Sequence, residues 1–277
     1  TLIVGLILSI PNINAQKTSG KLIYKRSVDW DMDKMFGDST NTKKKNMWKD
    51  MINKMMKKTN ERELIFNDSV SLFQYHEKEG SQGFSKGGMQ MHMSMMSRKN
   101  DKRYINFKTG KVVQQKEFMG KMFLIDDTLD KDLKWKLTGD KKKVKGLLCK
   151  KATLKLDSSI AGNFGGRYSS RMKSDSVDAE LEAWYTPMIP ISTGPQGLHG
   201  LPGLILAYKI EGTTNANGKE MDFSYKMTVK NINVGNVKEE IEKPDKGKKV
   251  TKKEYQKITK EKIEEMREMR GSGGSFH

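Results

Sequence analysis

Apolar and polar residues alternate along most of the chain, with the period of two that is typical of half-buried β-strands. The alternation is strictest at 219–234, where apolar side chains occupy every second position over most of the segment. Further strands, or pairs of strands, are expected at 21–30, 61–77, 104–107, 111–114, 117–126, 135–137, 144–156, 178–185 and 204–210. Turn-forming residues separate several of them: Asn67-Asp68-Ser69, Thr109-Gly110, Gly120 and Gly139-Asp140. The pattern therefore predicts about ten strands, many of them in hairpins.

Two segments follow a helical period instead. Between residues 46 and 58, apolar side chains recur at spacings of three and four, which predicts an amphipathic helix. These side chains are Met47, Met51, Ile52 and Met55. Near the other end, Thr251 and Glu254 form a capping-box pattern before a segment rich in lysine and glutamate, with Gly271 as its stop. This predicts a helix to residue 270, whose weak apolar stripe should dock loosely or project.

Antiparallel strands joined by short turns, with one apolar side, favour a barrel or a strongly curved sheet over a doubly wound fold. We predict a mainly β protein, with an antiparallel curved sheet or partial barrel, an early amphipathic helix and a C-terminal helix. The composition divides the chain into three parts. These are a signal peptide at 1–15, a single β-rich domain at 16–240, and a charged helix with a disordered tail at 241–277.

The first residues have the pattern of the end of a secretory signal. Residues 2–10 are apolar, and Pro11 and the small residue Ala15 follow, so cleavage is predicted after Ala15. The apolar run is too short to cross a bilayer, which takes about 20 apolar residues, so the mature chain is not expected to span a membrane. Since no cysteine follows the run, a lipid anchor is not expected. The predicted location is the periplasm or the extracellular medium.

The charge of the chain invites a nucleic-acid interpretation, because the formal net charge is +18 and lysines cluster at 43–45, 141–143 and 248–253. No helix-turn-helix, RNP-like or zinc-finger pattern accompanies these lysines, and a secreted protein rarely meets a specific nucleic-acid target. We therefore interpret them as solvated faces, with lipid head groups or an acidic protein partner as alternatives. The single cysteine, Cys149, has no disulfide partner and is expected to be a small buried hydrophobe.

The backbone conformation is most restricted at 183–206, because four of the six prolines of the chain lie there. In the turn at 201–204, Pro202 presets φ for the second position of a type II turn, and Gly203 supplies the positive φ of the third. We interpret this stretch as structural. His199 lies in the loop before the turn, where an imidazole can serve a site, although a lone loop histidine is more often inert.

The same stretch carries a family resemblance. The residues that carry it are Trp184, Tyr185, Pro187, Gly194, Pro195, Gly200, Leu201, Pro202, Gly203, Leu204 and Ile205, of which the last six spell GLPGLI. On this combination the chain resembles the GLPGLI family of secreted Bacteroidetes proteins, and the resemblance covers most of residues 17–210. It implies secretion and supports the β-rich fold. It implies no activity, because the family is named for its motif.

The best chemical candidate is a methionine-rich segment at 83–97. Its candidate metal ligands are Met89, Met91, His92, Met93, Met95 and Met96. In an extended chain, methionines at every second position share one face, and His92 points to the other. Soft thioethers with an optional imidazole suit Cu(I) and do not suit magnesium or calcium. Two alternatives stay open, namely gap-filling core surface and an adaptable docking surface for an apolar partner.

Catalytic patterns are absent from the sequence. It contains no Gly-x-Ser-x-Gly elbow, no His-Glu-x-x-His and no Walker loop, and its histidines at 76, 92, 199 and 277 are too scattered to nominate a triad. We therefore expect a non-enzymatic binding protein of the cell envelope. It would bind a soft metal, copper, through the methionine-rich segment. In the alternative hypothesis it binds an envelope protein or an apolar ligand, and the segment is core or docking surface.

Overall fold

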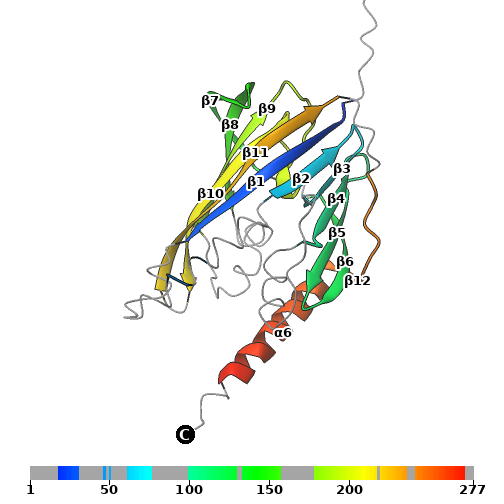
Figure 1. Cartoon of the computed structure of the whole chain (residues 1–277), viewed down its shortest axis with the longest axis vertical. Coiled ribbons are helices and arrows are strands. Elements are labelled where there is room, and N and C mark those ends of the chain that lie inside the picture. Colours follow the sequence, from blue (N-terminus) through cyan, green and yellow to red (C-terminus); the bar gives the residue numbers. More distant parts are fainter. Residues whose placement is uncertain are drawn as a thin grey trace, which may run out of the picture.

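The computed structural model describes residues 18–30, 46–47, 50, 61–76, 99–129, 133–156, 178–216, 219–235 and 241–271. In these residues the protein is mainly β, with one large curved sheet followed by the long helix α6 (Figure 1). The predicted fold class is confirmed. Residues 46, 47 and 50 are helical, but the rest of the predicted early helix lies outside the described residues, as does the predicted signal at 1–15.

The strands are β1 (Gly20–Trp30), β2 (Glu61–Phe66), β3 (Val70–Tyr75), β4 (Lys102–Asn106), β5 (Lys111–Phe118), β6 (Lys121–Thr128), β7 (Lys136–Val144), β8 (Leu147–Leu156), β9 (Asp178–Thr186), β10 (Leu204–Ala216), β11 (Lys219–Val234) and β12 (Lys248–Thr251). Their order across the sheet is β12-β6-β5-β4-β3-β2-β1-β11-β10-β9-β8-β7. The described neighbours are antiparallel, except that β12 runs parallel to β6. The short β12, at the end of the sheet, was not predicted.

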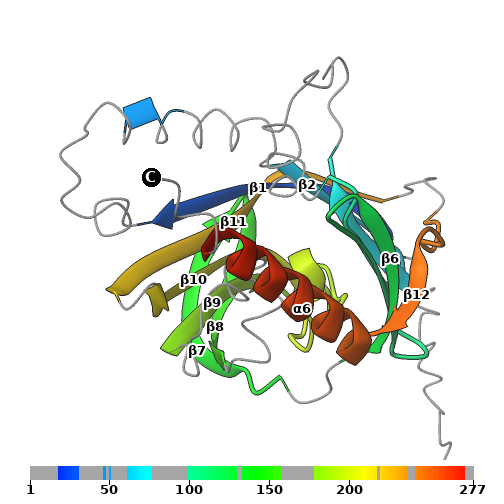
Figure 2. The same ribbon diagram turned by 90° about the horizontal axis from the view of Figure 1, so that it is seen from below.

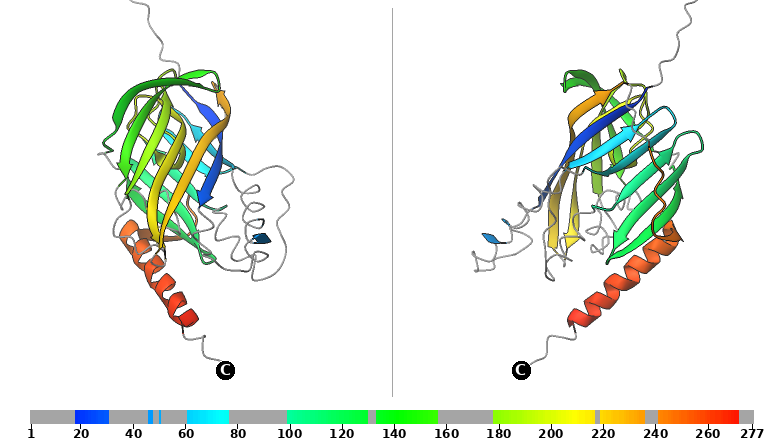
Figure 3. Two further views of the ribbon diagram at one scale, coloured as in Figure 1. Left: turned by 90° about the vertical axis from the view of Figure 1, so that its left-hand side faces the viewer. Right: turned by 45° about the vertical axis from the view of Figure 1, so that its right-hand side comes forward.

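The sheet curls around a concave inner face (Figure 3). Alternate side chains of β1 and of β8 to β11 point to this face and form the main core, in which Leu22, Tyr24, Leu181 and Tyr208 are almost fully buried. The buried hydroxyl of Tyr24 donates a hydrogen bond to the carbonyl of Ile205, with 2.7 Å between the oxygens. This bond ties β1 to β10 across the core, because a buried phenol needs a polar partner.

Two-residue turns join several of the hairpins. Met119 and Gly120, between β5 and β6, have φ values of 52° and 73°, and Lys145 and Gly146, between β7 and β8, have φ values of 50° and 83°. Positive φ at both central residues matches the right-handed twist of hairpin strands. The predicted turn at Gly139-Asp140 is wrong. Gly139, with φ of 84°, lies within β7 where the pairing with β8 shifts register, because a glycine of positive φ also suits a β-bulge.

Helix α6 (Lys252–Gly271) begins where the capping box predicts. The Glu254 N–H donates to Oγ1 of Thr251 at 3.2 Å, and the Thr251 N–H donates to the Glu254 carboxylate at 2.6 Å. Ile263 is buried, and the helix packs on Phe123 and other apolar residues of β5, β6 and β12. Figure 2 shows α6 crossing the mouth of the curved sheet. None of the helices in the described ranges is apolar over a length that could cross a membrane.

Candidate functional site

Residues 187–203, which we call the motif stretch, lie on the core of the sheet between β9 and β10. Backbone bonds hold it along β10, since Leu204 N–H donates to the Ile189 carbonyl and Ile205 N–H to the Thr193 carbonyl, each at 3.0 Å. Four of its apolar side chains are buried in the core: Ile189, Ile191, Leu198 and Leu201. The hydroxyl of Thr193 also bonds that of Ser71 on β3, at 3.3 Å. The motif stretch therefore connects the two halves of the sheet.

The turn that contains Gly203 differs from the prediction. Gly203 has a positive φ, 153°, but its N–H donates to the Leu201 carbonyl at 2.8 Å, and the Leu204 N–H that would close a type II turn bonds Ile189 instead. A Cβ at Gly203 would lie 2.2 Å from the carbonyl oxygen of Thr186. Glycine is required here because two backbone segments touch, and a type II turn is not formed.

The short 3-10 helix η1 (Pro195–Gly197) is the part of the motif stretch that reaches β3 and β4. Gln196, at its centre, has a positive φ of 58°. Its side-chain amide donates to the hydroxyl of Tyr225 at 3.0 Å, and its side-chain carbonyl accepts from the hydroxyl of Tyr208. The two tyrosine rings stack with centroids 5.8 Å apart. These contacts anchor η1 on β10 and β11.

Gly197 lies directly against Arg103 of β4. It has a φ of 80°, and a Cβ built on it would lie 2.2 Å from Nε of Arg103 and 2.8 Å from its Cδ. Only a glycine therefore lets the guanidinium and the backbone of η1 approach so closely. Gly197 of the motif stretch therefore lies beside the cation of Arg103, which was not predicted as a site residue from the sequence.

Arg103 belongs to a group of polar side chains on the inner face, which we call the inner-face polar patch: Arg103 on β4, Gln114 on β5 and Asp127 on β6. Arg103 pairs in register with Gln114, and the Gln114 amide donates to Oδ2 of Asp127 at 3.2 Å. Nζ of Lys252, in the first turn of α6, lies 3.6 Å from the same carboxylate oxygen. The patch therefore lies between η1 and the start of α6.

Arg103 is the unsatisfied member of the patch. Its Nε is fully buried and has no hydrogen-bond partner, and its guanidinium forms no ion pair with any residue in the described ranges. Burial lowers the pKa of Arg103 from its ordinary value, and the charge of Asp127 opposes that shift. Arg103 as a whole is only partly buried, but its Nε is closed off from water, and a buried donor without a partner is unfavourable, so this arrangement calls for an explanation beyond folding.

A signal for this patch is present in the sequence. Arg103 shares its strand face with Ile105, and Asp127 shares its face with Phe123 and Ile125, all three of which are buried. A polar residue that continues an apolar period-two series points to the same face as that series. Each position alone looks like the solvent-exposed end of a strand, so the patch emerges only when the three strands are adjacent.

The metal ligands that the sequence predicted, namely Met89, Met91, His92, Met93, Met95 and Met96, all lie outside the described residues. Within the residues that are described, no three His, Cys, Asp or Glu side chains gather in a way that could hold a metal ion.

Cys149 is buried and forms no disulfide, and its burial raises the pKa of the thiol. His199 belongs to the motif stretch, and its ring contacts the backbone of the same stretch, with 2.9 Å between Nδ1 and the Gly197 carbonyl oxygen.

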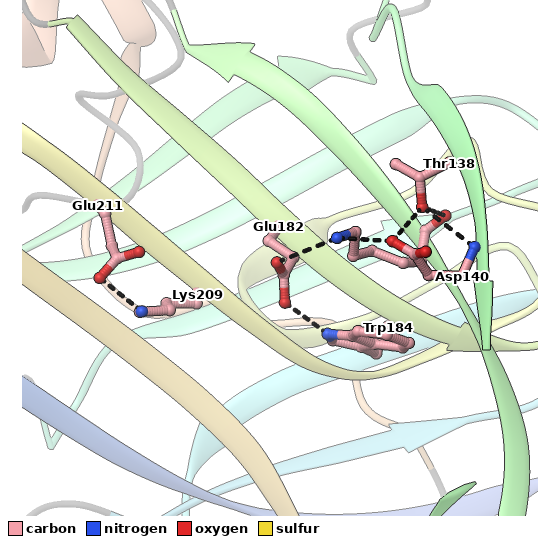
Figure 4. A network of polar contacts seen from close by, with 7 residues as sticks. Thr138, Asp140, Glu182, Trp184, Lys209 and Glu211 are labelled. Atoms are coloured by element: carbon pink, nitrogen blue, oxygen red, sulfur yellow. Dashed lines mark hydrogen bonds and ion pairs between the residues drawn. The ribbon is translucent and has the colours of Figure 1, made fainter. Parts of the chain in front are cut away.

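Trp184 lies on the other face of β9 from the buried Tyr185, in a network that Figure 4 shows. Its indole N–H donates to Glu182 at 2.6 Å, and Nζ of Lys142 lies 3.7 Å from the ring centroid. Lys151 then connects Glu182, at 3.8 Å, with Asp140, at 2.7 Å. Because the indole N–H and both carboxylates have partners, we interpret this network as a stabiliser of the sheet surface.

Comparison with known proteins gives one family model and two distant solved structures. No curated protein sequence matches the chain. Two solved structures of PNGF-II, in different space groups, are similar at 14% and 15% identity, with TM-scores of 0.46 and 0.44. They cover 88% and 87% of this chain, which spans about a third of the PNGF-II chains (33% and 32%). Residues 135–207, which include the whole motif stretch, match the family model described as "Protein of unknown function (Porph_ging)", a match compatible with the GLPGLI resemblance.

Proposed function

We propose that this chain is a non-enzymatic binding protein of the cell envelope and that its ligand contacts the inner-face polar patch. One observation carries the proposal. Three adjacent strands present Arg103, Gln114 and Asp127 on one face, beside the buried apolar residues Ile105, Val112 and Ile125. A buried polar group without a partner costs about 1–3 kcal/mol, so a fold gains nothing from leaving one unsatisfied. A ligand that accepts a hydrogen bond from Arg103 would satisfy the unpaired donor of the patch.

A purely structural role explains only part of the patch. Gln114 and Lys252 both engage Asp127, and this connection helps to join α6 to the sheet. Arg103 takes no part in those contacts. The envelope location is supported by the apolar run at 2–10 and by Ala15, which have the pattern of a secretory signal.

The proposal predicts that a small molecule is retained by the native protein. Native mass spectrometry of the full chain, purified from its natural host, should show a stoichiometric extra mass that unfolding releases. Replacing Gln114 with leucine should lower the occupancy by about tenfold, because it removes hydrogen-bonding groups worth about 1.4 kcal/mol from the patch while keeping a side chain of similar size.

Gln115 provides the matched control. It is the next residue of β5, is equally buried and points to the opposite face, where its amide donates to the Asn100 carbonyl at 3.1 Å. Gln115→Leu should therefore keep the bound molecule. A protein that carries no such molecule, or a Gln115→Leu variant that loses it as fully as Gln114→Leu, would contradict the proposal.

The methionine-rich segment supports a second, separate proposal, which is Cu(I) binding by Met89, Met91, His92, Met93, Met95 and Met96. The support is the sequence pattern, in which thioethers recur at every second position. Titration with Cu(I) under reducing conditions should saturate at a small whole number of ions. Replacing the five methionines with leucine should abolish binding and keep the fold, since leucine conserves size and lacks the sulfur. Unsaturable binding, or unchanged binding by the leucine variant, would refute the proposal.

A further inference from the structure

We infer that the ligand of the inner-face polar patch is an anion, and that a carboxylate or phosphate group of this ligand binds the guanidinium of Arg103. This inference rests on the proposed function, and it assigns both the ligand class and the residue that recognises it. An oxoanion is the partner that a guanidinium fits best, because the planar fork of N–H donors can make two parallel hydrogen bonds to it.

Arg103 itself has the properties of a binding residue. Its Nε is buried without a partner, and its guanidinium forms no ion pair in the described part of the chain. Buried arginines that serve only the fold are expected to have partners, and this chain contains an example for comparison. Nη1 of Arg62 donates to the Glu61 carbonyl at 2.9 Å, and its guanidinium lies 5.1 Å from the centre of the Tyr75 ring. Among the described residues Arg103 has no such partners, so its guanidinium is available to a ligand.

The charges in and beside the inner-face polar patch also favour an anion. Asp127 is the carboxylate whose charge acts on Arg103, but its Oδ2 already accepts from Gln114 and lies 3.6 Å from Lys252. Its other oxygen, Oδ1, accepts from the N–H of Thr128 at 3.0 Å. Within the part of the chain that the structure describes, two cations thus share one carboxylate, which leaves one positive charge without a counter-charge. A partly buried positive charge attracts anions more strongly than an exposed one, because water screens it less.

The backbone of η1 holds the side chain of Arg103 in place. Gly197 packs against Nε and Cδ of Arg103, and η1 is itself held by the hydrogen bonds of Gln196 to Tyr208 and Tyr225. The guanidinium is therefore positioned before a ligand arrives. Holding a binding group in place in advance reduces the entropy lost on binding, which is a property of ligand sites rather than of solvated surface arginines.

The test is a thermal unfolding titration of the full chain with inorganic phosphate and, separately, with sodium acetate, each at an ionic strength held constant with sodium chloride. The melting temperature of the wild type should rise saturably with at least one of the two anions, as expected when a ligand binds only the folded state. Comparison of the two titrations tells whether the site prefers a phosphate or a carboxylate. Arg103→Met should remove the response, and Arg103→Lys should weaken it because the fork is lost.

A second measurement separates a ligand-binding role from a structural one. Without added anion, Arg103→Met should melt at a higher temperature than the wild type, because methionine replaces a partly buried charge whose Nε has no partner among the described residues. Arg62→Met should melt at a lower temperature, because it removes a guanidinium that does have partners, and it should keep the response to anions. A structural Arg103 would instead melt at a lower temperature when replaced.

The inference is overturned if the wild type responds to phosphate and acetate no more than to chloride, or if Arg103→Met responds as the wild type does. Its failure can be told from the failure of the proposed function. A stoichiometric ligand that stays bound to Arg103→Met would preserve the binding function and refute the anion site. A native protein without any bound molecule would count against the binding function itself.

Discussion

Replacing Gly203 with valine is expected to lower the free energy of unfolding by about 3–5 kcal/mol. Two effects add up. A β-branched side chain is strained at a φ of 153°, and its Cβ would lie 2.2 Å from the carbonyl oxygen of Thr186 and 3.0 Å from Cα of Pro187. Backbone atoms in a paired strand end cannot move aside as a flexible side chain can. Urea unfolding followed by circular dichroism measures the loss.

Gly110 is the control for this substitution. It also has a positive φ, 67°, but nothing lies within 4 Å of the Cβ that would be added. Gly110→Val should therefore cost only the backbone strain, about 1–2 kcal/mol. Equal losses in the two variants would mean that the contact with Thr186 does not constrain the turn.

Replacing Leu201 with alanine is expected to lower the free energy of unfolding by about 3 kcal/mol. Leu201 is only 2% exposed and packs in the main core, so alanine leaves a cavity that the surrounding strands cannot fill. The result would show that the motif stretch is part of the core and not a loop free to rearrange. The same urea unfolding experiment measures it.

Met188, in the same stretch, is the matched control, because 65% of it is exposed. Met188→Ala should change the free energy of unfolding by no more than about 0.5 kcal/mol. If Leu201→Ala were as mild as Met188→Ala, the packing of the motif stretch described above would be wrong.

Several of these features could be predicted from the sequence because they depend on neighbours only a few residues apart. The period of two at 219–234 predicted β11 with the bounds that the structure has. The hairpin around Asn67 was predicted for the same reason, since its side-chain oxygen accepts from the N–H groups of Ser69 and Val70, each at 2.9 Å. The capping box of α6 likewise lies within four residues. Only the role of a glycine was ambiguous, as Gly139 shows, because turns and bulges both accept a positive φ.

The sequence by itself therefore determined the fold class, most strands and the start of α6, whereas the contact with Thr186 that requires glycine at Gly203 is tertiary. The tertiary structure alone decided that β12 joins β6 in parallel and that Gly197 meets Arg103, which is 94 residues earlier in the chain. Periodicity tells which face of a strand a side chain takes, but not which strands are adjacent or what covers that face. Arg103, Gln114 and Asp127 become a site only because the order of β4, β5 and β6 brings them together between η1 and α6.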